Sequence, residues 1–426
     1  MYPEDKNGAE RKSFVNTLHK FGYNTFFAGK YLNQYGRKEV GGLEHVPPGW
    51  DWWIGLEGNS RYYDYTLSVN GSREYHGFNH STDYLTNVIK KRALEFLNTA
   101  PSMFNPFFMM LSTPACHAPF DSEPKYYKNF SKYHAPRTKN FNIVNDHSKH
   151  WLLRLGEQPL RKKIINKMDE IYRKRLRTLM SVDAMVKEIY SLIKDKGLLN
   201  STYIIFTSDN GYHLGQFSLP LDKREPYEFD IRVPFYIRGP GISQNLLDYP
   251  ITNIDIAPTI LDLAGIDIPK HFDGESLKPL LQKEEFYSET TGLSSPYHFG
   301  KSNNISVRKT LLVEHRGEGS NINKGCEYLG PNLGDCHPEF DCKCSDSKNN
   351  TYSCLRHVSE VENFVFCSWE DDEHFEEYYN LGSDFYQLNN SINYISHDRR
   401  KKLNITLSNL KKCRGSHCYK LSKFVF

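Results

Sequence analysis

The sequence has little net charge and no long apolar run. Its 54 basic and 51 acidic residues leave a net charge of +3 over 426 residues, which is too small to indicate nucleic-acid binding. No apolar stretch approaches the ~18 residues that cross a bilayer, so we expect no membrane span. Residues 1–6 are polar and lack the apolar core of a signal peptide. The length exceeds what one core usually supports, which predicts two domains.

The sequence also lacks any Cys-x-x-Cys spacing. Eight of its nine cysteines lie between Cys326 and Cys418, and Cys116 stands alone. In a secreted chain this predicts about four disulfides and one free thiol. Zinc is the alternative, which the missing spacing and the scattered histidines disfavour. Eight Asn-x-Ser/Thr sequons also indicate the secretory pathway. Because no signal peptide is present, we expect that the natural N-terminus is missing from this sequence.

Apolar strands alternate with helical segments in the first part of the chain. The strands are expected at 25–30, 107–112, 202–207 and 233–237, and the helices at 10–21, 82–97, 160–198 and 254–263. This alternation predicts an α/β fold with a mostly parallel sheet covered on both faces. Ligands of such sheets bind beyond the carboxyl ends of the strands, which selects Lys30, the loop 113–120 and the residues after Thr207.

A polar stretch near residue 283 predicts a boundary between domains 1–282 and 283–426. The second domain is expected to be a smaller α+β unit with an antiparallel sheet and disulfides. Its elements are expected to include strands at 310–314 and 375–379 and a closing helix at 398–412. The basic stretch 399–423 could attract a polyanionic glycan, and a solvated helix face is the alternative.

Four short features carry chemistry. Asp209 and Asn210 follow an apolar strand, and their oxygens suit a hard cation such as calcium, although an Asx turn is the alternative. His117 lies between prolines at a strand end, where it can donate to an anion or protonate a leaving group. Lys30 and Lys223 can each bind an anionic group. Any of these alone is also compatible with a structural or surface role.

Together these features resemble the sulfatase family. The matching motifs are Gly22-Tyr23-Asn24-Thr25, Gly29-Lys30, Ser208-Asp209-Asn210-Gly211, Asp222-Lys223, Arg238-Gly239-Pro240-Gly241 and Asp255-Ile256-Ala257-Pro258-Thr259. The resemblance implies an alkaline-phosphatase-like fold and a calcium cofactor. It implies that Asp209 and Asn210 are calcium ligands and that Lys30, His117 and Lys223 contact the sulfate. Leu32 stands where the family often has a histidine, which leaves one sulfate contact unassigned.

Further segments are similar to the subgroup that acts on 6-sulfated N-acetylglucosamine, among them Gly211-Tyr212-His213-Leu214-Gly215-Gln216-Phe217. This implies a lysosomal enzyme that removes 6-O-sulfate from sulfated glycosaminoglycans such as heparan or keratan sulfate. His213, Lys149 and His150 are expected to contact the substrate; for Lys149 and His150 a surface helix cap is the alternative. The extracellular heparan endosulfatases share many of these motifs, so a fragment of one is a further alternative.

The nucleophile motif of the family is absent. Sulfatases use a formylglycine made from the cysteine of Cys-x-Pro-Ser-Arg by the formylglycine-generating enzyme, and two N-terminal aspartates as further calcium ligands. Cys116 is no substitute, because its proline spacing is wrong and no Ser-Arg follows. We therefore expect the chain as written to be truncated at its N-terminus and inactive. A non-catalytic glycan-binding relative is the alternative.

Overall fold

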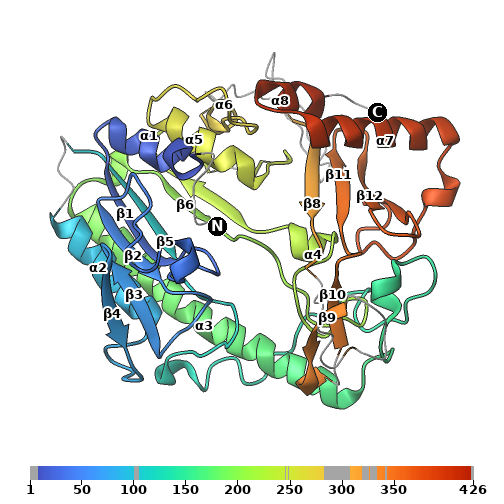
Figure 1. The fold of residues 1–426 in the computed structure, drawn as a ribbon, viewed down its shortest axis with the longest axis horizontal. Coiled ribbons are helices and arrows are strands. Elements are labelled where there is room, and N and C mark those ends of the chain that lie inside the picture. The colour runs from blue at the N-terminus through green and yellow to red at the C-terminus, as the bar shows by residue number, and fades with distance from the viewer. Residues whose placement is uncertain are drawn as a thin grey trace, which may run out of the picture. The chain divides into compact units, whose positions relative to one another are not determined.

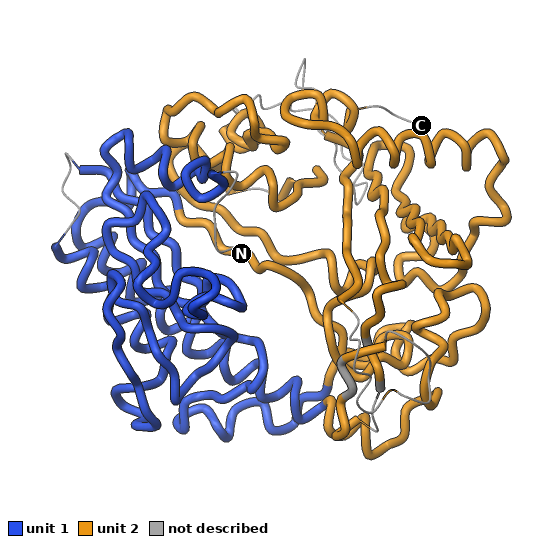
Figure 2. The backbone as a smooth tube through the Cα atoms, in the orientation of Figure 1, with its two compact units in different colours: residues 1–134, 169–203 blue, residues 135–168, 204–426 orange. Residues whose placement is uncertain are grey.

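The computed structural model places most of the chain in two compact units (Figures 1 and 2). The first unit comprises residues 1–134 and 169–203, and the second comprises residues 135–168 and 204–426. The residues described are 8–99, 105–244, 246–247, 249–282, 308–318, 326, 333–340 and 343–423. The predicted domain boundary near residue 283 falls in a stretch outside these ranges, so the division at 282/283 stays a prediction.

The first unit is built on a mixed five-stranded sheet with the order β4-β3-β2-β1-β5. Its strands are β1 (Asn24–Lys30), β2 (Trp52–Leu56), β3 (Tyr65–Val69), β4 (Ser72–His76) and β5 (Phe107–Ser112). β1 runs parallel to both β2 and β5, whereas β3 is antiparallel to β2 and to β4. The α/β class is confirmed, and the parallel part of this sheet is the part formed by the apolar strands β1, β2 and β5.

The helices of this unit are α1 (Phe14–Lys20), α2 (Leu85–Thr99) and α3 (Lys162–Asp195), and α3 begins in the second unit. Ser13 caps α1 by accepting a hydrogen bond from the backbone N–H of Asn16 at 3.3 Å. Apolar side chains of α2 and α3 pack with the sheet residue Phe26 in one buried cluster, which includes Phe96 of α2 and Val182 of α3. This core fixes the strands whose ends carry the predicted site residues.

The second unit contains two kinds of β-structure. β6 (Ile204–Thr207) and β7 (Phe235–Arg238) pair with each other, antiparallel, instead of joining a parallel sheet. The C-terminal part holds an antiparallel sheet of order β13-β12-β11-β8, as predicted. Its strands are β8 (Thr310–His315), β11 (Tyr352–Val358), β12 (Asn363–Trp369) and β13 (Glu376–Asn380), and β9 (Leu333–His337) pairs with β10 (Lys343–Ser347). The helices are α4 (Glu228–Ile231), α5 (Ile256–Leu263), α6 (Lys278–Leu281), α7 (His397–Lys412) and α8 (Ser416–Ser422).

Among the described residues, three disulfides cross-link the second unit. They are Cys326–Cys344, Cys354–Cys367 and Cys413–Cys418, with Cα separations of 6.1, 4.1 and 5.1 Å. They confirm the predicted pairing for six cysteines and exclude zinc at these positions, and Cys116 is a free thiol as expected. The side chains of Cys336 and Cys342 lie outside the described residues. Within the described ranges, no helix has the length and apolar character needed to cross a bilayer.

Candidate active site

Lys30 lies at the carboxyl end of β1, and the residue before it, Gly29, has to be a glycine. Gly29 has a φ of +115°, and a Cβ on it would lie 2.0 Å from the backbone oxygen of Ser112 on β5. Only glycine allows the two strands to approach this closely. Lys30 follows directly, and its Nζ donates to Asn33 Oδ1 at 2.5 Å. The ammonium group is therefore oriented at the strand end by a neighbouring amide.

His117 belongs to the loop that follows β5. Because β5 is parallel to β1 with Ser112 opposite Gly29, this loop and Lys30 leave the sheet at the same edge. His117 Nδ1 lies 2.9 Å from the carbonyl oxygen of Ala118, and its own carbonyl accepts a hydrogen bond from the Tyr62 hydroxyl at 2.9 Å. A carbonyl oxygen can only accept a hydrogen bond, so in this contact Nδ1 carries the hydrogen.

Asp209 and Asn210 follow β6, and the chain bends at Asp209. Asp209 Oδ1 accepts hydrogen bonds from the Asn210 N–H at 3.0 Å and from the Ser208 hydroxyl at 3.3 Å. Gly211 then passes close to a second segment, because a Cβ on it would lie 2.1 Å from the backbone oxygen of Phe229. The Asp209 side chain is exposed, and its bonds go to the adjacent residues Ser208 and Asn210 instead of to the N–H two residues on that defines an Asx turn.

Lys223 is held in the same unit by a buried network. His213 Nδ1 lies 2.8 Å from Asp230 Oδ2, and its backbone N–H donates to the Asp222 carbonyl at 2.9 Å. Asp222 in turn accepts from the Lys223 N–H at 2.9 Å. His213 is 1% exposed. It therefore positions the segment that carries Lys223, and its predicted contact with substrate stays a prediction.

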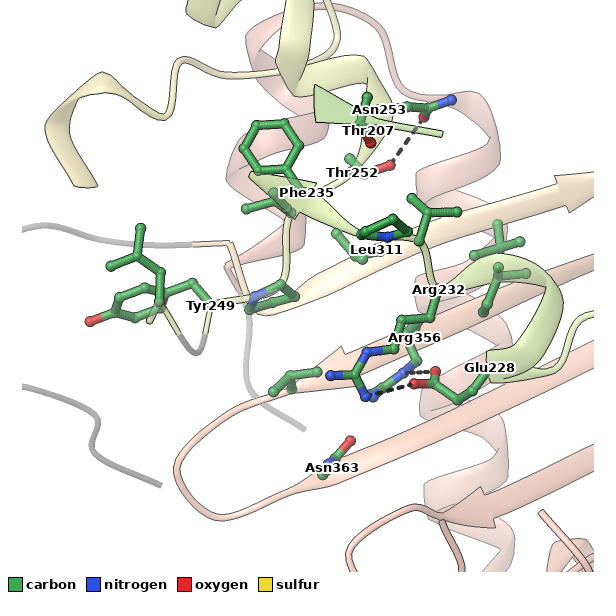
Figure 3. Close-up of a pocket in the computed structure, with 18 of the residues that line it drawn as sticks. Thr207, Glu228, Arg232, Phe235, Tyr249, Thr252, Asn253, Leu311, Arg356 and Asn363 are labelled. Atoms are coloured by element: carbon green, nitrogen blue, oxygen red, sulfur yellow. Dashed lines mark hydrogen bonds and ion pairs between the residues drawn. The ribbon is translucent and has the colours of Figure 1, made fainter. Parts of the chain in front are cut away.

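Asp209, Asn210 and Lys223 all line one cavity of 2320 Å³ in the second unit. Figure 3 shows part of its wall, with Thr207 at the end of β6 and with Glu228, Arg232 and Arg356. The structure thus brings these three predicted residues to one hollow. Lys30 and His117 belong to the first unit, and the predicted convergence of all five residues stays a prediction.

Lys149 is buried inside the second unit. Its Nζ donates to the hydroxyl of Tyr379 at 2.5 Å and to the carbonyl of Gln387, and it lies 4.4 Å from the ring centre of Phe217. Burial lowers the pKa of Lys149 to about 8, against an opposing effect of the Glu377 carboxylate. These contacts give Lys149 a structural role, and its predicted contact with the sugar stays a prediction.

His150 is buried in the same region. Its Nε2 lies 3.0 Å from Asp371 Oδ2, and its ring stacks on Trp369 at a centroid distance of 4.9 Å. It is 0% exposed, so neither a surface cap nor an open sugar contact describes its surroundings in this structure. As with Lys149, a role in substrate binding stays a prediction.

Several residues of the cavity wall were not singled out by the sequence. Glu225 is 2% exposed, and its Oε2 has no hydrogen-bond partner among the described residues. Burial, followed by the nearby carboxylates of Asp230 and Asp346, raises the pKa of Glu225 well above its usual range. Arg232 and Arg356 also line the cavity. Arg356 is marked by no local motif, because its partner Glu228 lies 128 residues away in the chain.

Among the described residues, no group of three or more His, Cys, Asp and Glu side chains is arranged to hold a metal ion. Asp209 and Asn210 are hard oxygen donors of the kind that calcium prefers. Calcium takes about six to eight oxygens, so this pair fits as one part of a ligand set.

Comparison with known proteins gives a consistent result. A family model described as Sulfatase matches residues 1–266. N-acetylglucosamine-6-sulfatase of Homo sapiens is 46% identical over 400 residues, covering 93% of this chain and 68% of that protein. The enzyme of the same name from Bos taurus gives the same identity and coverage. The extracellular sulfatase SULF-1 homolog of Drosophila melanogaster is 41% identical over 277 residues, covering 64% of this chain and 24% of that protein.

Solved structures agree on the fold. A protein in complex with its substrate D-glucosamine-2-N,6-O-disulfate matches with a TM-score of 0.68 at 22% identity, covering 94% of this chain and 81% of that one. A protein described as a putative sulfatase from Bacteroides fragilis matches with a TM-score of 0.64 at 17% identity, covering 92% of this chain and 75% of that one. At these identities the likeness concerns the fold alone.

Proposed function

The chain belongs to the sulfatase family of sulfuric ester hydrolases, and from this premise we propose that it acts on the 6-O-sulfate ester of N-acetylglucosamine in sulfated glycosaminoglycans. The proposal for the substrate is supported by the name of the mammalian relatives and by the length of the match. The structural observation that carries it is the cavity that Asp209, Asn210 and Lys223 share.

The proposed roles follow from charge. Sulfatases generally use calcium and a formylglycine, whose hydrate supplies the nucleophile. Asp209 and Asn210 would hold the calcium ion, which draws charge from the sulfate oxygens. Lys223 would bind the same sulfate as a point charge. Lys30 would add a second positive charge and His117 a proton for the leaving oxygen.

We also propose a lysosomal location and a glycosylated chain. The three disulfides support an oxidising compartment during folding. Several sequon asparagines are exposed, among them Asn79, Asn200 and Asn389. Treatment of the secreted protein with an N-glycosidase is expected to lower its mass.

The metal assignment is tested by calcium-dependent stability. Calcium is expected to raise the Tm of the unaltered protein, because an ion that binds only the folded state stabilises it. Asp209→Ala should lose this rise, and Asp372→Ala, which removes an exposed carboxylate of the same unit, should keep it. An equal rise in all three proteins would show that calcium binds elsewhere.

The substrate assignment is tested by calorimetric titration with N-acetylglucosamine 6-sulfate in the presence of calcium. Lys223→Ala is expected to lower the affinity about tenfold or more, and Lys402→Ala, at an exposed position outside this cavity, to leave it unchanged. No binding by the unaltered protein would refute the proposal.

A second candidate is a glycan-binding protein without turnover. It uses the same cavity, because Asp209, Asn210 and Lys223 could bind a sulfate whether or not the ester is cleaved. Co-expression with the formylglycine-generating enzyme, followed by an assay of sulfate release, separates the two. Binding with no release supports the non-catalytic reading for this chain, and release comparable to that of an intact sulfatase refutes it.

A further inference from the structure

One carboxylate in the cavity wall serves two guanidinium groups. Glu228 Oε1 accepts from Arg356 Nε at 2.8 Å, and Glu228 Oε2 lies 3.9 Å from Arg232 Nη1. Figure 3 shows the guanidinium groups of both arginines on the same side of the Glu228 carboxylate, with dashed lines joining them to its oxygens. Glu228 is the first residue of α4 and Arg232 follows its last residue, so the short helix sets their spacing. Glu228 carries one negative charge and the two arginines carry two positive charges, so the three side chains together have a net charge of +1.

Arg232 is the less tightly paired of the two arginines. Arg356 is fixed by β11: its side chain is 12% exposed, and its Nη1 also donates to the His357 carbonyl at 2.7 Å. The side chain of Arg232 is 67% exposed, and its ion pair among the described residues is the loose one with Glu228. Arg356 therefore holds the carboxylate in place, and the guanidinium of Arg232 keeps most of its donors for a ligand.

Two other carboxylates of the wall are paired elsewhere. Asp230 is paired with His213 at 2.8 Å, and Glu362 is paired with Arg399 at 2.8 Å. Glu314 and Glu360 also line the cavity, and both are exposed to solvent. Water screens these two charges, and among the described residues the ion pair recorded for Arg232 is the one with Glu228.

The cavity is larger than one sugar requires. Its volume of 2320 Å³ exceeds the range of about 300–1,000 Å³ that is usual for small-molecule pockets. Lys223 and Arg232 line the same space, together with the paired Arg356. A ligand with two anionic groups can therefore address two cationic positions in one cavity.

We propose that Arg232 binds a second anionic group of the substrate, carried by the sugar next to the one whose sulfate lies at Lys223. This inference rests on the proposed function, because it takes the 6-sulfated sugar as the occupant of the first position. The guanidinium fork recognises a carboxylate or a sulfate through two parallel N–H donors. Arg232 thereby selects a glycan in which the neighbouring sugar is acidic over one in which it is neutral.

The test compares two disaccharides of equal size in calorimetric titrations with calcium at low salt. In one, N-acetylglucosamine 6-sulfate is linked to a hexuronic acid, and in the other it is linked to galactose. The unaltered protein is expected to bind the uronate disaccharide about fivefold more tightly, the upper value for an exposed ion pair. Arg232→Ala should abolish this preference, and Arg232→Lys should keep part of it.

Arg414→Ala is the matched control, because Arg414 is an exposed arginine of the same unit outside this cavity. It should keep the full preference. Equal affinities of the unaltered protein for the two disaccharides would overturn the inference while leaving the proposed function intact. An undiminished preference in Arg232→Ala would assign the acidic group to another residue. Failure of the unaltered protein to bind either disaccharide would refute the inference and the proposed function together.

Discussion

His357 on β11 is a buried histidine among positive charges, and this predicts that acid weakens the second unit. It is 0% exposed, and its Nδ1 lies 2.9 Å from the Thr310 hydroxyl oxygen. Burial, followed by the charges of Lys309, Arg356 and Arg399, lowers the pKa of His357 from 6.5 to about 4. The folded protein therefore keeps this ring neutral at a pH where an exposed histidine is charged.

The size of this loss in stability follows from the difference in proton binding at His357 between the unfolded and the folded protein. Below a pH of about 6.5 the unfolded chain takes up a proton at His357, and the folded protein does so only near pH 4. The free energy of unfolding consequently falls as the pH drops from 6.5 toward 4, and this group causes no further loss below that. At pH 5 the full effect is about 2 kcal/mol. Partial solvent screening reduces it, and we expect roughly 1–2 kcal/mol.

The perturbation is His357→Gln, which stays neutral at every pH and can still bond to Thr310. Its free energy of unfolding in urea should fall less between pH 7 and pH 5 than that of the unaltered protein. Hydrogen exchange of the β11 amides would assign the effect to this sheet. His397→Gln, at the exposed start of α7, is the matched control and should keep the original slope. If the free energy of unfolding falls by the same amount between pH 7 and pH 5 in all three proteins, the reasoning is refuted.

Three further outcomes are expected. Gly29→Ala should destabilise the first unit by about 2 kcal/mol or more, because the new Cβ would lie 2.0 Å from the Ser112 oxygen; an unchanged Tm would contradict this. Replacing Cys354 and Cys367 by alanine should cost about 3 kcal/mol for a loop of 13 residues, measured by urea unfolding without reductant. Burial raises the pKa of Glu275 to about 7, so its contribution is present at acid pH and is lost as the pH rises from 4.5 through 7. Glu275→Gln should therefore flatten the Tm profile over that interval.

The strands and helices with strong periodicity were predictable from the sequence. The apolar runs that became β1 and β5 and the long helix α3 lie within a few residues of their expected positions. In the first unit, β2, β3 and β4 were not predicted. β2 is the aromatic-rich Trp52–Leu56, which has no regular alternation, and β4 is the polar Ser72–His76, whose place at the sheet edge depends on its pairing with β3.

The candidate site was predictable only where a local motif carries it. Asp209 and Lys223 belong to short family motifs, Ser208-Asp209-Asn210-Gly211 and Asp222-Lys223, and both line the cavity. Lys149 resembles a surface lysine in its local sequence, yet its partner Tyr379 comes 230 residues later. Arg356 likewise donates a hydrogen bond to Glu228, which lies 128 residues earlier in the sequence. Contacts of this range depend on the folded sheet, so composition and spacing could not reveal them.

Two pH-sensitive groups of the second unit, His357 and Glu275, affect its stability in the lysosomal compartment proposed for the chain. At acid pH the C-terminal sheet loses stability, because His357 stays neutral in the folded protein and takes up a proton when the chain unfolds. Glu275 has the opposite effect on its own segment, because its raised pKa favours the folded protein at acid pH. The disulfide between Cys354 and Cys367 joins β11 to β12 within the sheet that carries His357. Its contribution of about 3 kcal/mol does not depend on that protonation and exceeds the 1–2 kcal/mol lost at His357. The same sheet can therefore remain folded in an acidic compartment, provided that the chain has first passed through an oxidising one.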